Sequence, residues 1–408
     1  MKIKLKLVCI SLFALAFLGA ETLSLEECIN IARSNNPSIQ SANLSSEIGR
    51  SRLRQAYSTL LPSVSVSSGL SSSSRSSWDI GKSVGLNAGM TFYTPGMYSG
   101  IKSASINSKV NELNIQSDQN DVISQISALY YRILSIQKII EVYEVNISVA
   151  EESLRKTRSM YEERVITESD VLKSEAQKGD FESQLLGQKQ IYASYLRSMN
   201  ILLGLDPRSD LSLIDIDVEN ISIPNYDEAR EEMLNYNPAF ATAILQKEVS
   251  KTYVAAAKET FLPSVSGGYS YSNSLENAVD PINSVSLSAS WTLFNGLSRK
   301  ENLSQSKLQL EQAEINVDNI LRLLDQELSD LYTQFETYTA MIDINERRLR
   351  SAKRDFEIVQ QQYDLGKATI LDRMQAQVAV LSAESALVEA KYSRKMVEAD
   401  ILKLINKI

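Results

Sequence analysis

The stretch LLPSVSVSSG, residues Leu60–Gly69, returns 201 residues later as FLPSVSGGYS, residues Phe261–Ser270. Two further pairs of short stretches keep the same interval: NNP at 35–37 with YNP at 236–238, and VGLNAGMTFY at 84–93 with VSLSASWTLF at 285–294. A repeat of this length indicates a duplicated domain, because the repeats of a solenoid are only about 20 to 50 residues long. The sequence therefore predicts two structural copies, one in each half of the chain.

The repeated stretches alternate apolar residues with small or polar ones. Between Ser83 and Phe92, and again between Ser284 and Leu293, every second residue is apolar. This alternation is typical of a half-buried sheet in a soluble domain and also of a membrane barrel, whose strands need about ten such residues. Tyr93 and Trp291 add aromatic residues at one end, as in a membrane barrel. Because no later apolar run is long enough for a transmembrane helix, membrane insertion would have to use strands.

An apolar seam with alternating steps of four and three residues follows the strands in each copy. In the first copy it comprises Val122, Ile126, Leu129, Ile133, Ile136, Ile140, Tyr143, Ile147, Ala150, Leu154, Thr157 and Tyr161. The second copy repeats each position 202 residues later, from Leu324 to Tyr363. Such heptad spacing is typical of coiled-coil helices, and no proline interrupts either run. We expect two helices of about 65 residues, each about 95 Å long at a rise of about 1.5 Å per residue.

The start of the chain resembles a secretory signal peptide. Three lysines precede an apolar run at 7–18, and Gly19 and Ala20 supply a small-residue cleavage site. The apolar run is too short to span a bilayer, which takes about 20 residues. We therefore expect an exported protein whose one remaining cysteine, Cys28, forms no disulfide within the chain.

These signals divide the chain into four parts. Residues 1–20 form the signal peptide, and residues 206–236 form an equatorial linker to which the sequence assigns no definite structure. Residues 21–205 form the first structural repeat, with a helix, strands at 62–72 and 83–93, and a helical hairpin at 97–204. Residues 237–408 form the second structural repeat, with a helix, strands at 263–273 and 284–294, and a helical hairpin at 297–405.

The composition argues against several classes of function. The chain contains no histidine, which is the commonest general base and a frequent zinc ligand. Its 42 basic residues are outnumbered by 50 acidic ones, and the net charge of −8 argues against a nucleic-acid partner. The sequence offers no nucleophile with a base, no phosphate-binding loop and no cluster of metal ligands. We expect no enzymatic activity, no cofactor and no metal site.

The predicted strands are too few to close a barrel within one chain. Each copy supplies two, whereas the smallest membrane barrels have about eight strands. The chain must therefore oligomerise if it forms a barrel. A dimer would give eight strands, a barrel narrow enough to be filled by its own side chains, and a trimer would give twelve. The serines, glycines and threonines expected on the inner face are small and leave space in the lumen.

The order and double occurrence of these motifs resemble the TolC family of outer-membrane efflux proteins, over essentially the whole chain from Leu25 onward. The resemblance implies a mainly α-helical fold with a β-barrel part, in which each internally duplicated chain has four membrane strands and long coiled-coil hairpins. It also implies a homotrimer that forms a twelve-stranded barrel in the outer membrane of a Gram-negative bacterium. The helices would continue this barrel as a tunnel through the periplasm.

The implied function is that of the exit duct of a tripartite efflux or type I secretion system. The duct would pass drugs, other small molecules or proteins from an inner-membrane transporter to the exterior, with a periplasmic adaptor (membrane fusion) protein and outer-membrane lipid as further partners. The alternative is a secreted coiled-coil structural or surface filament protein, which would share the heptads and Ser-rich strands. A filament would need neither four amphipathic strands nor two equal hairpins. A wide bore has no substrate pocket, so the residues do not identify the exported substrate.

The two turns between the paired helices also match each other. YEERVITESDVL at 161–172 aligns with YDLGKATILDRM at 363–374, and each contains Thr-x-x-Asp, the pattern of a helix-capping box. By resemblance these tips dock the adaptor through Arg164, Val165, Thr167, Asp170, Gly366, Lys367 and Thr369. The family also places aspartates around the entrance on the second tip, which assigns a pore gate to Tyr363, Asp372 and Gln375. Arg164 replaces the family's tip glycine, and Gln375 replaces its second aspartate.

Overall fold

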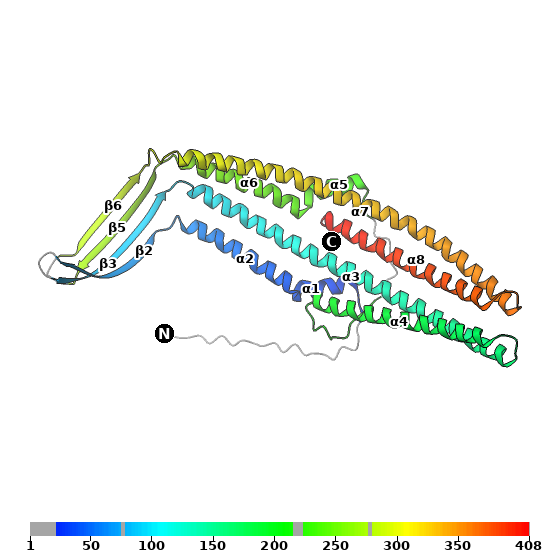
Figure 1. Cartoon of the computed structure of the whole chain (residues 1–408). Coiled ribbons are helices and arrows are strands. Elements are labelled where there is room, and N and C mark those ends of the chain that lie inside the picture. The colour runs from blue at the N-terminus through cyan, green and yellow to red at the C-terminus, as the bar shows by residue number, and fades with distance from the viewer. Residues whose placement is uncertain (1–21, 75–77, 215–222, 276–279, 408) are drawn as a thin grey trace. The chain divides into compact units, whose positions relative to one another are not determined.

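The computed structural model describes residues 22–74, 78–214, 223–275 and 280–407 (Figure 1). The predicted signal peptide at 1–20 lies outside these residues. The chain divides into two compact units, and the long helices α3 (Met97–Glu162) and α7 (Ser298–Asp364) contribute to both. The hairpin unit comprises residues up to 36 with 123–222 and 335–399, and the sheet unit comprises 37–122, 223–334 and 400–408. Among the described residues, no helix combines the length and the apolar character needed to cross a bilayer.

The sheet unit holds an antiparallel sheet of four strands in the order β2-β3-β5-β6. Its strands are β2 (Ser63–Ser74), β3 (Trp78–Tyr93), β5 (Ser264–Ser274) and β6 (Ile282–Ser290). Pairing of β3 with β5 joins the strands of the two copies (Figure 1). β6 ends at Ser290, before the predicted boundary at 294, because Ser290 pairs with Ser264, the first residue of β5. The chain then turns toward α7 through Gly296 and Leu297, both at positive φ.

The alternation gives this sheet two chemically different faces. The polar face carries Ser65, Ser67, Asn87, Thr91, Ser266, Ser270, Ser286 and Ser288. The apolar face carries Val64, Val66, Val84, Leu86, Met90, Val265, Val285 and Leu287. In the single chain Val64 is 67% and Val285 is 85% exposed, whereas a soluble sheet covers its apolar face. The apolar face must therefore be covered from outside the chain.

The helices repeat the duplication seen in the strands. The pre-strand helices are α2 (Pro37–Ser58) and α6 (Pro238–Glu259), and the returning helices are α4 (Glu168–Leu202) and α8 (Ile370–Leu404). Every residue of the predicted heptad seams except Tyr161 is buried or half-buried, so the predicted coiled-coil packing is confirmed. The ion pair from Lys189 to Glu144, at 2.8 Å, recurs 202 residues later as Lys391 to Glu346, at 3.4 Å.

Sequence analysis missed two helices, α1 (Leu25–Asn35) and α5 (Tyr226–Tyr236). The second of them lies in the stretch to which the sequence assigned no definite structure. A capping box starts each helix, formed by Ser24 with Glu27 and by Asn225 with Glu228. Both helices end before an Asn-Pro pair whose proline is the first residue of the next helix, where the missing N–H costs nothing.

The asparagines of the Asn-Pro pairs explain why this motif is duplicated. The amide of Asn36 donates to the carbonyl of Leu202 at 2.7 Å, and the amide of Asn237 donates to the carbonyl of Leu404 at 2.9 Å. These carbonyls lie in the last turns of α4 and α8, where no donor within the helix remains. Each motif therefore caps the returning helix of its own copy.

A buried tyrosine attaches a small parallel pairing to α3. β1 (Thr22–Leu23) pairs with β4 (Ser212–Leu213), and the hydroxyl of Tyr130 donates to the carbonyl of Ile214 at 2.7 Å. Tyr130→Phe should lower the free energy of unfolding by about 1–3 kcal/mol, because the buried carbonyl loses its donor. Chemical denaturation measures this change. Tyr131→Phe is the control, since its hydroxyl makes no hydrogen bond within the described residues. Equal stability of the two variants would contradict the proposed attachment.

Candidate functional site

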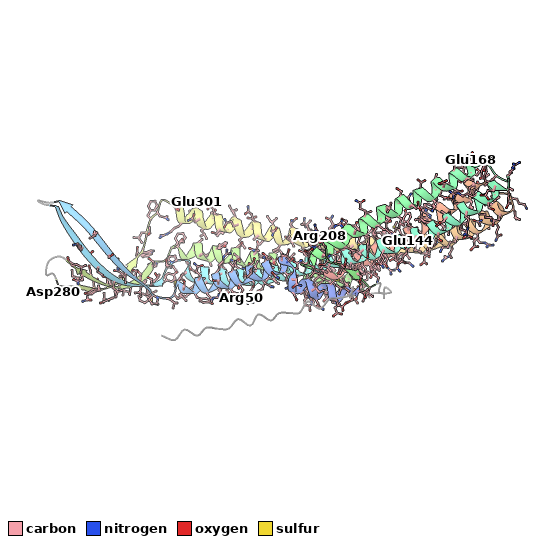
Figure 2. The ribbon with its side chains drawn as sticks, turned by 90° about the horizontal axis from the view of Figure 1, so that it is seen from below. Arg50, Glu144, Glu168, Arg208, Asp280 and Glu301 are labelled. Atoms are coloured by element: carbon pink, nitrogen blue, oxygen red, sulfur yellow. The ribbon has the colours of Figure 1, made fainter. Side chains whose placement is uncertain are left out.

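The two helical tips have closely similar backbones. α3 ends at Glu162 and α4 begins at Glu168, which lies at this tip in Figure 2. α7 ends at Asp364 and α8 begins at Ile370. In each turn a residue at positive φ follows the helix: Arg164 at 63° in the first and Gly366 at 70° in the second. The next backbone N–H closes both turns at 2.8 Å, from Val165 to Met160 and from Lys367 to Gln362.

Arg164 therefore occupies a position that favours glycine. The left-handed conformation costs a residue with a side chain about 1–2 kcal/mol, which the second tip avoids with Gly366. Gly366→Ala should accelerate hydrogen exchange of the Lys367 amide by about tenfold, because the turn opens more easily. Arg164→Gly should slow exchange of the Val165 amide by a smaller factor, since glycine also gains freedom in the open state. Unchanged exchange in Gly366→Ala would contradict this account of the turn.

Helix capping by Thr-x-x-Asp, predicted from the sequence, is confirmed. The hydroxyl of Thr167 donates to Asp170 at 2.8 Å, and that of Thr369 donates to Asp372 at 2.6 Å. The backbone N–H of Asp372 returns a bond to the Thr369 hydroxyl at 3.2 Å. The hydrogen bond from the threonine hydroxyl is the main cause that lowers the pKa of each aspartate. Both carboxylates are therefore ionised at neutral pH.

The residues assigned to the tips by resemblance differ in their exposure. Arg164, Val165, Thr167, Gly366, Lys367 and Thr369 are exposed on the turns, and Asp170 is half-buried. Asp372 and Gln375 are both exposed on the first turns of α8. Tyr363, in contrast, is only 5% exposed, and its hydroxyl has no hydrogen-bond partner within the described part of the chain.

The structure adds Arg373, which sequence analysis missed. Arg373 is 4% exposed, and its guanidinium donates to the side chains of Gln360 on α7 and Ser153 on α3. The guanidinium also lies 5.7 Å from the ring centre of Phe356, within range of a cation–π contact. Burial is the main cause that lowers the pKa of Arg373, although an arginine remains charged. Spacing could have located it, because Arg373 lies three residues after buried Ile370 and four before buried Gln377.

Arg373 belongs to a set of contacts that join the second hairpin to the first. The amide of Gln377 on α8 donates to the carbonyl of Asn146 on α3 at 2.9 Å. The amide of Gln177 on α4 donates to the carbonyl of Met374 at 3.3 Å. Lys156 on α3 pairs with Asp364 at the end of α7. We call the Arg373–Ser153, Gln377–Asn146 and Lys156–Asp364 contacts the hairpin latch. All three contacts are noncovalent, so they can break and form again when the hairpins move.

The tips combine an exposed charge with a set of polar contacts between the two hairpins. No group of three or more histidine, cysteine, aspartate or glutamate residues within 22–74, 78–214, 223–275 and 280–407 could hold a metal ion. Asp372 presents a negative charge at the end of one hairpin, and the hairpin latch attaches that hairpin to its neighbour. Packing of Leu381 on α8 against Ala150 and Phe181 also joins the two hairpins. A hairpin held in this way can move as a rigid body when its contacts break.

Comparison with known proteins identifies the family. The model of the family described as "Outer membrane efflux protein" matches residues 28–204 and 229–407, which is most of the chain and covers both copies. The chain belongs to the outer membrane efflux protein family. The chain is also 21% identical over 386 residues to the outer membrane protein TolC of Vibrio cholerae, covering 90% of this chain and 87% of that relative. The predicted family is therefore confirmed, and the filament alternative is set aside.

Two further likenesses agree with this membership. The crystal structure of the Campylobacter jejuni CmeC outer membrane channel has the same fold, with a TM-score of 0.84 over 94% of this chain and 85% of that chain at 19% identity. The alkaline protease secretion protein AprF of Pseudomonas aeruginosa is 23% identical over 69% of this chain and 61% of its own length. The protein is thus an outer-membrane channel with a periplasmic helical tunnel, an exit duct for efflux or secretion rather than an enzyme.

Proposed function

We propose that three copies of the chain form the duct, with their strands closed into one twelve-stranded barrel and their helices forming the tunnel wall. Within the described residues β2 and β6 each pair on one side only, so the sheet has two open edges. Open edges are not viable in lipid, where unpaired backbone groups find no water. Pairing of β2 in one copy with β6 in the next removes both edges and covers the backbone of every strand.

The mass of the assembly tests this proposal. Native mass measurement of the protein in mild detergent should give three chains per particle. Chemical crosslinking in the outer membrane should give the same stoichiometry. A folded monomer or dimer in both experiments would overturn the proposed trimer.

The gate is proposed to lie on the second tip, at Tyr363, Asp372 and Gln375. Three copies of this tip around a common axis would bring three Asp372 carboxylates together at the entrance. The exposure of Asp372 supports this role, and the cap bond to Thr369 keeps the carboxylate ionised. Gln375 adds no charge, so Asp372 would be the main source of negative potential at this entrance.

Asp372→Asn should reduce the cation selectivity of the channel and weaken block by multivalent cations. An amide has no net charge to attract the blocking ion, although it can still accept the cap bond from Thr369. Planar-bilayer recordings with and without a multivalent cation measure both effects. Asp170→Asn is the matched control, because Asp170 caps the first tip in the same way. Equal block in wild type and Asp372→Asn would leave Asp372 as a helix cap alone.

The first tip and its neighbourhood are proposed to dock a periplasmic adaptor protein, which connects the duct to an inner-membrane transporter. A groove of about 920 Å³ lies between α3 and α4, and its charged lining includes Glu151, Arg155, Arg158, Glu175 and Lys178. Charges of both signs along a groove suit a partner helix with a complementary pattern. Arg164, Val165, Thr167, Asp170, Gly366, Lys367 and Thr369 would contact the same partner at the tips.

The cargo is proposed to be drugs, other small molecules or proteins. Relatives support both kinds of cargo, because one is named for antibiotic efflux and another for alkaline protease secretion. Deleting the gene and measuring drug sensitivity alongside the secreted protein fraction would separate them. Unchanged drug sensitivity and an unchanged secreted fraction would contradict the proposed cargo.

A further inference from the structure

The apolar face of the sheet contains a groove of about 410 Å³. From that face it is lined by Ala88, Met90, Phe92, Gly267, Tyr269, Val285 and Leu287. These residues come from β3, β5 and β6 in the part of the sheet that adjoins the helices, since β5 begins at Ser264 and β3 ends at Tyr93. The groove is therefore continuous with the face that the chain leaves uncovered.

Strand register explains why the groove forms there. Met90 pairs with Gly267, and Gly267 pairs with Leu287. In this cross-strand row, the glycine therefore lies between two residues with long side chains. One neighbouring row consists of Ala88, Tyr269 and Val285, and the other consists of Tyr93, Val265 and Ala289. Gly267 and the Phe92 ring that packs on it form the floor of the groove, and Met90 and Leu287 are its walls.

Two aromatic side chains contribute to the groove. Phe92 has no partner on β5, because the register shifts between Thr91 and Tyr93. Its ring packs on Gly267, where an added Cβ would lie 2.7 Å from Phe92 Cε2. On the other side of the groove, the hydroxyl of Tyr269 donates to Asn283 Oδ1 at 2.7 Å. This bond holds the Tyr269 ring toward the next cross-strand row, in which Tyr271 pairs with Asn283. The Phe92 ring therefore covers Gly267, and the groove lies over this ring.

We propose that this groove binds one acyl chain of a phospholipid from the inner leaflet of the outer membrane. The groove lies in the half of the sheet next to the helices, and in this family the helices lie in the periplasm, so the adjoining leaflet is the inner one. Its volume falls within the range of about 300 to 1,000 Å³ that is typical of ligand pockets. The inference goes beyond the proposed function and depends only on the membrane location of the sheet.

The binding would be driven by packing rather than by transfer out of water. Bulk lipid tails are as apolar as the groove, so no hydrophobic gain separates the two environments. An acyl chain lying over the Phe92 ring would gain dispersion contacts with Met90, Phe92 and Leu287 that an empty groove forfeits. We therefore expect phospholipid that is retained in detergent more strongly than the surrounding lipid.

Native mass spectrometry of the protein in mild detergent tests this binding, with phosphatidylethanolamine added back as the probe. Wild type should retain the probe. Ala88→Phe should fill the groove from the end near Tyr269 and lower the affinity for the probe by about tenfold. Ala289→Phe is the matched control, because it makes the same change on the same face outside the lining and should retain the probe as wild type does.

Leu287→Ala is a second test variant. It removes one wall of the groove, whereas Ala88→Phe adds a larger side chain, and it should also fail to retain the probe. Equal retention of the probe by wild type, Ala88→Phe and Leu287→Ala would overturn the proposal. An absence of retained probe in wild-type trimers would overturn it as well, and would indicate that a neighbouring copy fills the groove. Wild-type particles that contain fewer than three chains would contradict the proposed trimer instead, so the two failures are distinguishable.

Discussion

Arg373→Met is expected to leave the channel open for longer in planar-bilayer recordings without lowering its thermal stability. Arg373 joins α8 to α3 through the hydroxyl of Ser153, and methionine cannot make that bond. We propose that the gate is closed while the hairpin latch is formed. A hydrogen bond to a charged group is worth about 1.5–3 kcal/mol, so its loss should lower the population of the closed state, relative to the open state, by about tenfold or more in each chain. Stability should hold, because removing the desolvation cost of the buried cation offsets the donor that Ser153 and Gln360 lose.

Two further variants test whether Arg373 holds the gate closed or only stabilises the fold. Ser153→Ala removes the acceptor and leaves the guanidinium buried, so it should favour the open state and also lower the unfolding temperature. Lys367→Met is the control, since it removes a cation that is exposed at the same tip and should leave the open time unchanged. If Arg373→Met loses stability and its open time matches that of Lys367→Met, Arg373 supports the fold and does not hold the gate.

The fold could be predicted from the sequence because two periodicities dominate it. Alternation by two residues specifies which face of a strand is apolar, and the heptad specifies which stripe of a helix is buried. Both signals occur twice, so each copy supports the interpretation of the other. The boundary of β6 escaped prediction because Trp291 and Leu293 continue the alternation after the strand has ended. Pairing ends there because β5 begins at Ser264, the partner of Ser290, and periodicity carries no information about where a partner strand begins.

The helices α1 and α5 were missed for a different reason. Each has 11 residues and ends at an Asn-Pro pair. Recurrence of this pair indicates the duplication but does not by itself indicate a helix boundary. The capping boxes at Ser24 and Asn225 were present in the sequence and could have identified both starts. The hydrogen bonds from Asn36 and Asn237 could not be foreseen, because they join residues 166 and 167 positions apart.

The candidate site was only partly accessible to sequence reasoning. The caps at Thr167 and Thr369 are local, so their partners follow from spacing alone. Arg373 was overlooked because a charged residue on a helix is usually solvated. Its burial depends on Ser153, 220 positions away, and on the ring of Phe356. Tyr363 was placed at the gate by resemblance, and its buried hydroxyl makes it a packed residue of the hairpin in the single chain.

Ile133→Asp is expected to abolish the accumulation of assembled channel in the outer membrane. Ile133 lies on the heptad seam of α3 and is fully buried within the chain. A carboxylate there would lack both water and a partner, at a cost of several kcal/mol, about the size of a domain's whole margin of stability. In the proposed trimer that cost would be incurred once per chain. Ile133→Val should assemble, because it costs only about 0.5–1.5 kcal/mol. Normal levels of Ile133→Asp trimer in membrane extracts would show that the seam is not the packed core of the tunnel wall.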